Sequence, residues 1–155
     1  MSRRDQIRLT DAELAAFLDE QRTVIVATNG RDGWPHLMPL WYTVRAGELW
    51  AWTYARSQKV RNLERDPRVT WQVESGTSYE QLRGVMVKAN AVLHRDVETV
   101  EAFGVELFER YTGSAPLPDA VGGMVRAQAP KRVALQFVAA EPAVSWDHGK
   151  LGGTY

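Results

Sequence analysis

Short runs of alternating hydrophobic and polar residues dominate this chain and predict a sheet rather than a helical bundle. Six runs are rich in β-branched and aromatic residues and are bounded by turn-forming residues, as in strands that bury one face. We predict strands at residues 23–29, 34–44, 49–54, 68–74, 83–94 and 130–139. Pro35 and Pro39 fall inside the second run, so we expect an edge strand or a bulge there, because proline cannot donate to a strand ladder.

Four further segments have helical spacing or helix-capping residues. We predict helices at residues 11–20, 57–66, 96–110 and 118–127. Thr10 can cap the first helix and Glu13 can close a capping box with it. The third helix carries a stripe that we expect to be buried, made of Val97, Val100, Gly104, Leu107 and Phe108.

Helices interrupt the strands only at some connections, so the order does not follow a regular strand–helix–strand repeat. This pattern indicates a mainly β fold, a six-stranded antiparallel barrel with a few peripheral helices. The length of 155 residues fits one domain, and we find no internal repeat or linker. We therefore expect residues 1–155 to form a single domain.

Composition narrows the classes of partner. Lysine plus arginine equals aspartate plus glutamate, 19 of each, so no global positive field is available to hold nucleic acid. No run reaches membrane-spanning length, and the polar N-terminus is not followed by an apolar secretion core. Cysteine is absent, which excludes disulfides, a thiol nucleophile and cysteine-bound metal. We expect a cytoplasmic protein that does not act on membranes or nucleic acids.

The most informative candidate site lies where the third predicted strand leads into a helix. The first turn of that helix carries Ser57, Lys59 and Arg61. A helix N-terminus offers free backbone N–H groups and the positive end of a dipole, so a hydroxyl and two cations there suit a phosphate. The alternative interpretation is an amphipathic helix whose basic residues are simply solvated.

Other catalytic groups are not evident. His36, His94 and His148 lie far apart and lack metal-ligand spacing, so we predict no metal site. No serine has a nucleophile-elbow context, and no carboxylates are paired for acid–base hydrolysis. If the protein is an enzyme, a cofactor is expected to supply the chemistry.

Tryptophans line the predicted strands. Alternation places Trp50, Trp52 and Tyr54 on one face of the strand at residues 49–54, and Leu49, Ala51 and Thr53 on the other. Such aromatic residues fill a barrel core or a dimer surface, and one or two can also lie against a flat cofactor. The sequence leaves both interpretations open.

Several short motifs together resemble one known family. They are Pro39-Leu40-Trp41, Thr53 at a strand end, Ser57-x-Lys59-x-x-Asn62-Leu63 and Asp66-Pro67-Arg68. Their order resembles the pyridoxamine 5'-phosphate oxidase-like superfamily, the flavin-binding split β-barrel, over residues 14–138. The ending, residues 145–155, looks like members that use the deazaflavin coenzyme F420. The further basic residues of pyridoxamine phosphate oxidases proper are not found here.

The resemblance implies a homodimer with two cofactor sites at the subunit interface. It implies that the cofactor phosphate meets Thr53, Ser57 and Lys59, with Arg61 and Asn62 near. It places the ring beside the second strand, at Met38, Pro39, Leu40 and Trp41. Trp146 and His148 are expected to line the substrate side if the tail folds over the pocket.

The resemblance leaves the cofactor and activity open. F420 carries a phosphodiester and a polyglutamate tail, and four cations in ten residues favour it over FMN, namely Arg56, Lys59, Arg61 and Arg65. The leading hypothesis is an F420H2-dependent reductase that passes a hydride to an electron-poor unsaturated small molecule. The alternatives are an FMN-dependent oxidoreductase and a non-catalytic cofactor- or haem-binding protein, with His36, His94 or His148 as axial ligand.

Overall fold

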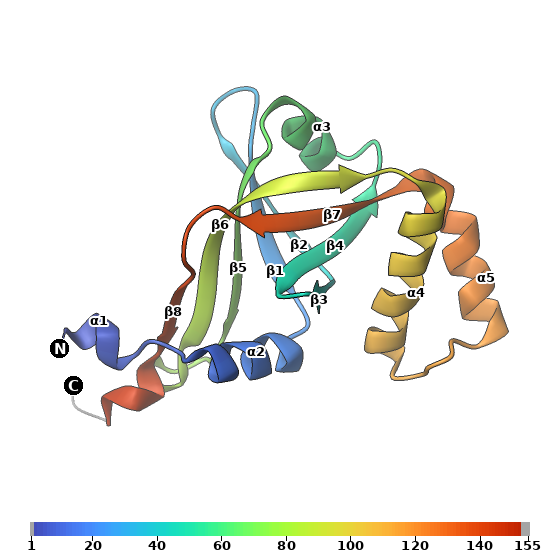
Figure 1. Cartoon of the computed structure of the whole chain (residues 1–155). Helices are drawn as coiled ribbons and strands as arrows, with labels where there is room; N and C mark the ends of the chain where they lie inside the picture. The colour runs from blue at the N-terminus through green and yellow to red at the C-terminus, as the bar shows by residue number, and fades with distance from the viewer. Residues whose placement is uncertain (1, 153–155) are drawn as a thin grey trace.

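The computed structural model describes residues 2–152, which form one curled antiparallel sheet with helices around it (Figure 1). The strands are β1 (Val24–Asn29), β2 (Pro35–Leu40), β3 (Tyr42–Arg45), β4 (Glu48–Tyr54), β5 (Arg68–Ser75), β6 (Arg83–His94), β7 (Arg132–Ala139) and β8 (Val144–Asp147). The α-helices are α1 (Arg3–Gln6), α2 (Asp11–Glu20), α3 (Gln58–Arg65), α4 (Val97–Thr112) and α5 (Asp119–Gln128). Three 3-10 turns are η1 (Tyr79–Gln81), η2 (Ala129–Lys131) and η3 (His148–Leu151).

The sheet closes on itself at Trp41. Its strand order is β2-β1-β5-β6-β7-β4-β3, so β2 and β3 occupy opposite ends of the path although only Trp41 separates them in sequence. The sheet must therefore curl until its two edges meet at this residue. This geometry confirms the predicted split β-barrel with peripheral helices.

The structure divides the predicted second strand in two and adds a strand to the tail. The Tyr42 amide donates to the Tyr111 hydroxyl, 2.9 Å away, and the chain then changes its pairing partner from β1 to β4. The tail segment β8 pairs with the first half of β6. The described barrel therefore has eight strands rather than the six predicted.

Two hydrophobic clusters lie on opposite faces of β4, as its alternation predicts. Leu49 and Ala51 belong to the barrel core, together with β-branched residues of β1, β5 and β6. Trp52 faces the other way and packs beneath α4 and α5, which cover this side of the sheet (Figure 1). The sheet thus holds the end of β4 between two packed layers.

Helix α4 is stabilised at both ends. The Asp96 side chain accepts from the Thr99 amide at its start, 2.9 Å away, and Gly113 adopts φ 71° just after its end. Val97, which the predicted stripe includes, is 45% exposed in the first turn, and Phe103, which it omits, is fully buried. No helix of residues 2–152 is long and apolar enough to cross a membrane.

Helix α2 closes one end of the barrel. The predicted capping box is present, with Thr10 and Glu13 each bonding the other's backbone N–H. At its C-terminus, the Arg110 guanidinium donates to the carbonyl oxygens of Leu18, Asp19 and Gln21. These bonds join the end of α4 to the end of α2.

Candidate cofactor site

Strand β4 leads directly into the candidate phosphate site. Tyr54 ends the strand, and its carbonyl accepts from the Ser57 amide 3.0 Å away, which turns the chain into α3. Ser57 is the N-cap residue, but its hydroxyl makes no capping bond. Its Oγ is buried and has no hydrogen-bond partner in the described residues. A buried hydroxyl at a helix N-terminus is thus left available to an anion.

Lys59 is the central cation of this site. Its side chain is buried, with 7% of the residue exposed, and its Nζ donates to Thr53 Oγ1 over 3.0 Å. Within residues 2–152 it forms no ion pair with a carboxylate. Burial lowers the pKa of Lys59, and the nearby positive charge of Arg132 lowers it further. The described residues therefore give the Lys59 ammonium group a hydroxyl partner but no anionic one.

Asn62 has a structural role in the described chain. It is fully buried, its Nδ2 donates to Thr28 Oγ1 over 3.0 Å, and its Oδ1 accepts from Gln58 at 2.9 Å. It therefore fastens α3 to β1 and fixes the helix that carries Lys59. Arg61, one turn away from Ser57, is exposed.

The predicted ring-binding segment, Met38–Trp41, forms the end of β2 and the residue after it. Met38, Pro39 and Trp41 are exposed and Leu40 is half-buried. The Trp41 ring stacks on Tyr111 at a centroid distance of 4.2 Å, and its edge contacts Phe108 at 5.7 Å. Phe108 also contacts Trp52, which adjoins Thr53 in β4. Phe108 thus connects Trp41 to Trp52, on the face of β4 opposite to Thr53.

Trp146 and His148 do not share this location within one chain. The indole of Trp146 lies across Gly84, where an added Cβ would be 2.4 Å from its Cζ2 atom. His148 Nδ1 is 3.0 Å from the Tyr79 carbonyl oxygen. Figure 1 shows β8 near α1, at the end of the barrel away from α3. The tail therefore runs along β6, and a substrate role for these two residues stays a prediction; the final motif residues 153–155 lie outside the described part.

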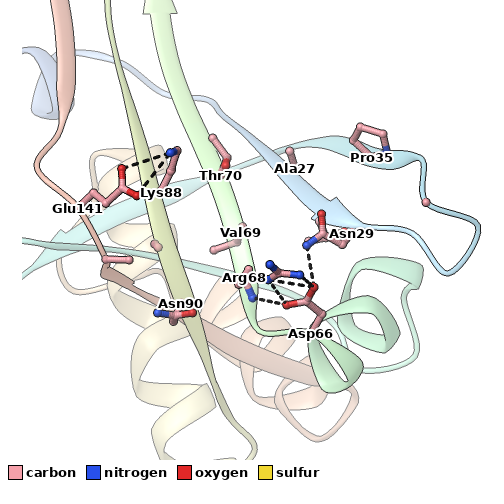
Figure 2. Close-up of a pocket in the computed structure, with 14 residues that line it drawn as sticks. Ala27, Asn29, Pro35, Asp66, Arg68, Val69, Thr70, Lys88, Asn90 and Glu141 are labelled. Atoms are coloured by element: carbon pink, nitrogen blue, oxygen red, sulfur yellow. Dashed lines mark hydrogen bonds and ion pairs between the residues drawn. The ribbon is translucent and has the colours of Figure 1, made fainter.

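A separate hollow of about 620 Å³ opens on the outer face of β1, β5 and β6 (Figure 2). Its charges are already paired: Asp66 binds Arg68 through two hydrogen-bonded oxygens, and Lys88 pairs with Glu141 at 3.2 Å. The hydrogen bonds from Arg68 and then that from Asn29 hold the pKa of Asp66 well below its usual range. The hollow offers volume but little uncompensated charge for an anion.

Sequence reasoning missed two residues beside the site. Tyr111 lies in the last turn of α4, beyond the predicted helix end. Its hydroxyl accepts a hydrogen bond from the Tyr42 amide and donates one to the Arg22 carbonyl, 2.5 Å away. Arg132 begins β7, and its Cζ lies 3.6 Å from the Tyr54 ring centroid. Neither residue belongs to a local motif, so only long-range pairing reveals them.

Solved structures share this fold. The conserved hypothetical protein Rv2991 from Mycobacterium tuberculosis is 42% identical, with a TM-score of 0.89, and the match covers all of this chain and 95% of that one. A structure named F420 reductase matches with 21% identity and a TM-score of 0.63, over 83% of this chain and 93% of its own. HutZ, the haem storage protein from Vibrio cholerae, matches with 16% identity and a TM-score of 0.69, over 90% and 96%.

A family model that matches most of the chain identifies the family. No protein of curated function matches this chain. The family model described as pyridoxamine 5'-phosphate oxidase matches residues 10–145, which include β1 through β7, α3 and the start of β8. The chain therefore belongs to the pyridoxamine 5'-phosphate oxidase-like family, whose fold is the flavin-binding split β-barrel.

Proposed function

We propose that this protein is an F420H2-dependent reductase that acts as a homodimer. Reduced F420 would supply a hydride to an electron-poor unsaturated small molecule, such as one with a polarised C=C or C=N bond or a conjugated ring. The residues of the chain would hold the cofactor's anionic groups, orient its ring and exclude water from the reacting atoms.

The observation that carries this proposal is the buried Lys59 without a carboxylate. A buried cation is costly unless it is paired, and the Ser57 hydroxyl beside it also lacks a partner. A phosphate would satisfy both groups and the free N–H groups at the start of α3. Thr53, Ser57 and Lys59 would therefore hold the phosphate, with Asn62 fixing the helix.

Charge along α3 supports F420 over FMN. The side chains of Arg56 and Arg61 are exposed and make no hydrogen bond or ion pair with the described residues. They would meet the carboxylates of an F420 tail as it leaves the phosphate site. Arg65, by contrast, donates to the Asn29 carbonyl, 2.5 Å away, and is already engaged. FMN, with one terminal phosphate, would leave Arg56 and Arg61 unused.

The edge strand β2 supports the homodimer. Trp34 is 75% exposed and Leu37 is 57% exposed, next to the exposed segment Met38–Trp41. An exposed apolar edge of this kind is typical of an interface, because covering it removes hydrophobic surface and free strand edge from water. A partner subunit over β2 would also cover the proposed ring position at Pro39 and Trp41.

Haem binding is a second candidate, and one observation favours it. His36 Nδ1 is buried without a hydrogen-bond partner in the described part of the chain, and one solved structure of this fold is a haem storage protein. His94, in contrast, is hydrogen-bonded to Gln136 at 2.8 Å and stacks on Trp50, and His148 is bonded to the Tyr79 carbonyl. A Soret band on haem addition, lost in His36→Ala, would support this candidate.

The test is a titration of the purified protein with F420, with FMN and with haem. We expect micromolar or tighter binding of F420, weaker binding of FMN, and oxidation of F420H2 by at least one acceptor of a panel of quinones, nitroaromatics and tetrapyrroles. Tight binding of FMN without binding of F420 would overturn the cofactor assignment. Light scattering during gel filtration should give twice the 17.5 kDa chain mass, and a monomer would contradict the proposed dimer.

A further inference from the structure

Arg132 lies at the same end of β4 as the proposed phosphate site, but on β7 and on the face that carries Trp52 and Tyr54. It is the first residue of β7 and pairs directly with Tyr54 in the β4–β7 ladder. The preceding residue, Lys131, accepts from the Ala55 amide at 2.9 Å, which fastens the start of β7 to the turn before Ser57. The fold therefore holds Arg132 next to the strand–helix junction.

Aromatic rings fix the guanidinium in place. Its Cζ lies 3.6 Å from the centroid of the Tyr54 ring and 5.0 Å from that of Trp52. Stacking on aromatic faces orients the planar guanidinium and leaves its N–H edge free to donate. Such preorganisation reduces the entropy lost when a ligand binds.

The guanidinium has no anionic partner among the residues that the structure describes. Its Nε is buried without a hydrogen-bond partner, and the side chain forms no ion pair within residues 2–152. Two other ring-stacked arginines are paired with carboxylates: Arg45 with Glu106 at 2.6 Å and Arg110 with Asp19 at 2.8 Å. Two unpaired cations thus flank the end of β4: Arg132 stacks on Tyr54 and Trp52 on one face, and Lys59 bonds Thr53 on the other. The positive charge of Arg132 contributes to the lowered pKa of Lys59.

We propose that Arg132 is a second anion ligand of the cofactor site, paired in function with Lys59. The two cations would take a ligand with at least two negative charges, such as a phosphate with a neighbouring carboxylate. Lys59 would bind one group as a point charge, and Arg132 would bind the other with its planar fork. This inference rests on the proposed function and deepens it by adding a residue from a distant strand.

The test compares Arg132→Gln, Arg132→Lys and a matched control, Arg126→Gln, which removes the same charge from an exposed position on α5. Titration with F420 should give about tenfold to hundredfold weaker binding for Arg132→Gln, as for one lost charge-assisted hydrogen bond. Arg132→Lys should recover part of the loss, and Arg126→Gln should bind like the parent. Equal affinity of Arg132→Gln and the parent would overturn the inference and leave the reductase proposal standing.

Inorganic pyrophosphate separates this inference from the identity of the cofactor. It should raise the melting temperature of the parent by mass action and raise that of Arg132→Gln much less. Should Arg132→Gln fail to fold, the same comparison applies to Arg132→Lys, for which a smaller rise than the parent's is expected. The same rise in parent and variants would overturn the inference, and no rise in the parent would overturn the anion site as a whole.

Discussion

Lys59 Nζ donates a hydrogen bond to Thr53 Oγ1 over 3.0 Å, and this contact joins the end of β4 to the first turn of α3. An ammonium group has three N–H donors, and among the described residues only this one hydrogen bond is made by Lys59 Nζ. A buried ammonium group with donors to spare destabilises the folded chain unless a ligand completes its contacts. We therefore expect Lys59 to lower the stability of the free protein and to increase its affinity for an anionic ligand.

Replacing Lys59 should separate stability from binding. We expect Lys59→Met to be no less stable than the parent in urea unfolding, because the variant buries a thioether chain in place of an unpaired cation. Its affinity for F420 should fall at least about tenfold, which corresponds to about 1.4 kcal/mol. The control Lys88→Met removes the same charge from the outer hollow (Figure 2) and should leave the affinity unchanged. If only Lys88→Met bound F420 more weakly than the parent, the cofactor would have to bind in that hollow instead.

The lowered pKa of Lys59 predicts how binding depends on pH. An anion binds the protonated lysine, so affinity should decrease as the pH rises through the lowered pKa, before an ordinary lysine titrates. The unfolded chain keeps the ordinary pKa and holds the proton longer, so the stability of the free protein should increase over the same interval. Both changes should vanish in Lys59→Met. Titrations with F420 at a series of alkaline pH values measure the first, and a pH-independent affinity in the parent would contradict the prediction.

Two helix glycines form a matched pair for the packing beneath α4. A Cβ at Gly104 would be 2.6 Å from Trp52 Cζ3 and 2.9 Å from Val125 Cγ1, whereas one at Gly123 in α5 would meet no atom within 4 Å. Gly104→Ala should lose about 1–2 kcal/mol of unfolding free energy, because the clash exceeds the gain in helix propensity. Gly123→Ala should gain up to about 1 kcal/mol. Urea unfolding of both variants checks the pair, and a stabilised Gly104→Ala would show that α4 packs differently.

The contact between Glu13 in α2 and Lys150 in η3 should be sensitive to acid. The hydrogen bond from Lys150, followed by that from the Thr10 amide, lowers the pKa of Glu13 to about 2. The stability linked to this carboxylate is complete above the unfolded pKa and is lost as the pH falls toward about 2. The melting temperature of Lys150→Met should therefore fall less steeply between about pH 5 and about pH 2 than that of the parent. Parallel curves would show that the pair contributes nothing.

Local patterns sufficed for much of the fold. β6 has the predicted bounds, α3 begins after Ser57 as expected, and the Thr10–Glu13 capping box is present. These features depend on alternation, caps and turns within a few residues of sequence. The motif around Lys59 was recognisable for the same reason, because strand, turn and helix follow one another directly.

The remainder depends on contacts between distant segments. The break at Trp41 arises because the Tyr42 amide donates to the hydroxyl of Tyr111, 69 residues away, instead of to a neighbouring strand. Arg132 reaches the end of β4 only because β7 pairs with β4. Trp146 packs on β6 because Gly84 has no side chain there. No local periodicity carries this information, so the closing of the barrel and the composition of the site required the structure.

The most direct measurement is a crystal structure of the protein with F420. We predict that the cofactor phosphate lies within hydrogen-bond distance of Lys59 Nζ and Ser57 Oγ, at the N-terminus of α3, with the ring beside Pro39 and Trp41. A phosphate bound in the hollow between Arg68 and Lys88, or a Lys59 side chain that makes no contact with the cofactor, would contradict the account.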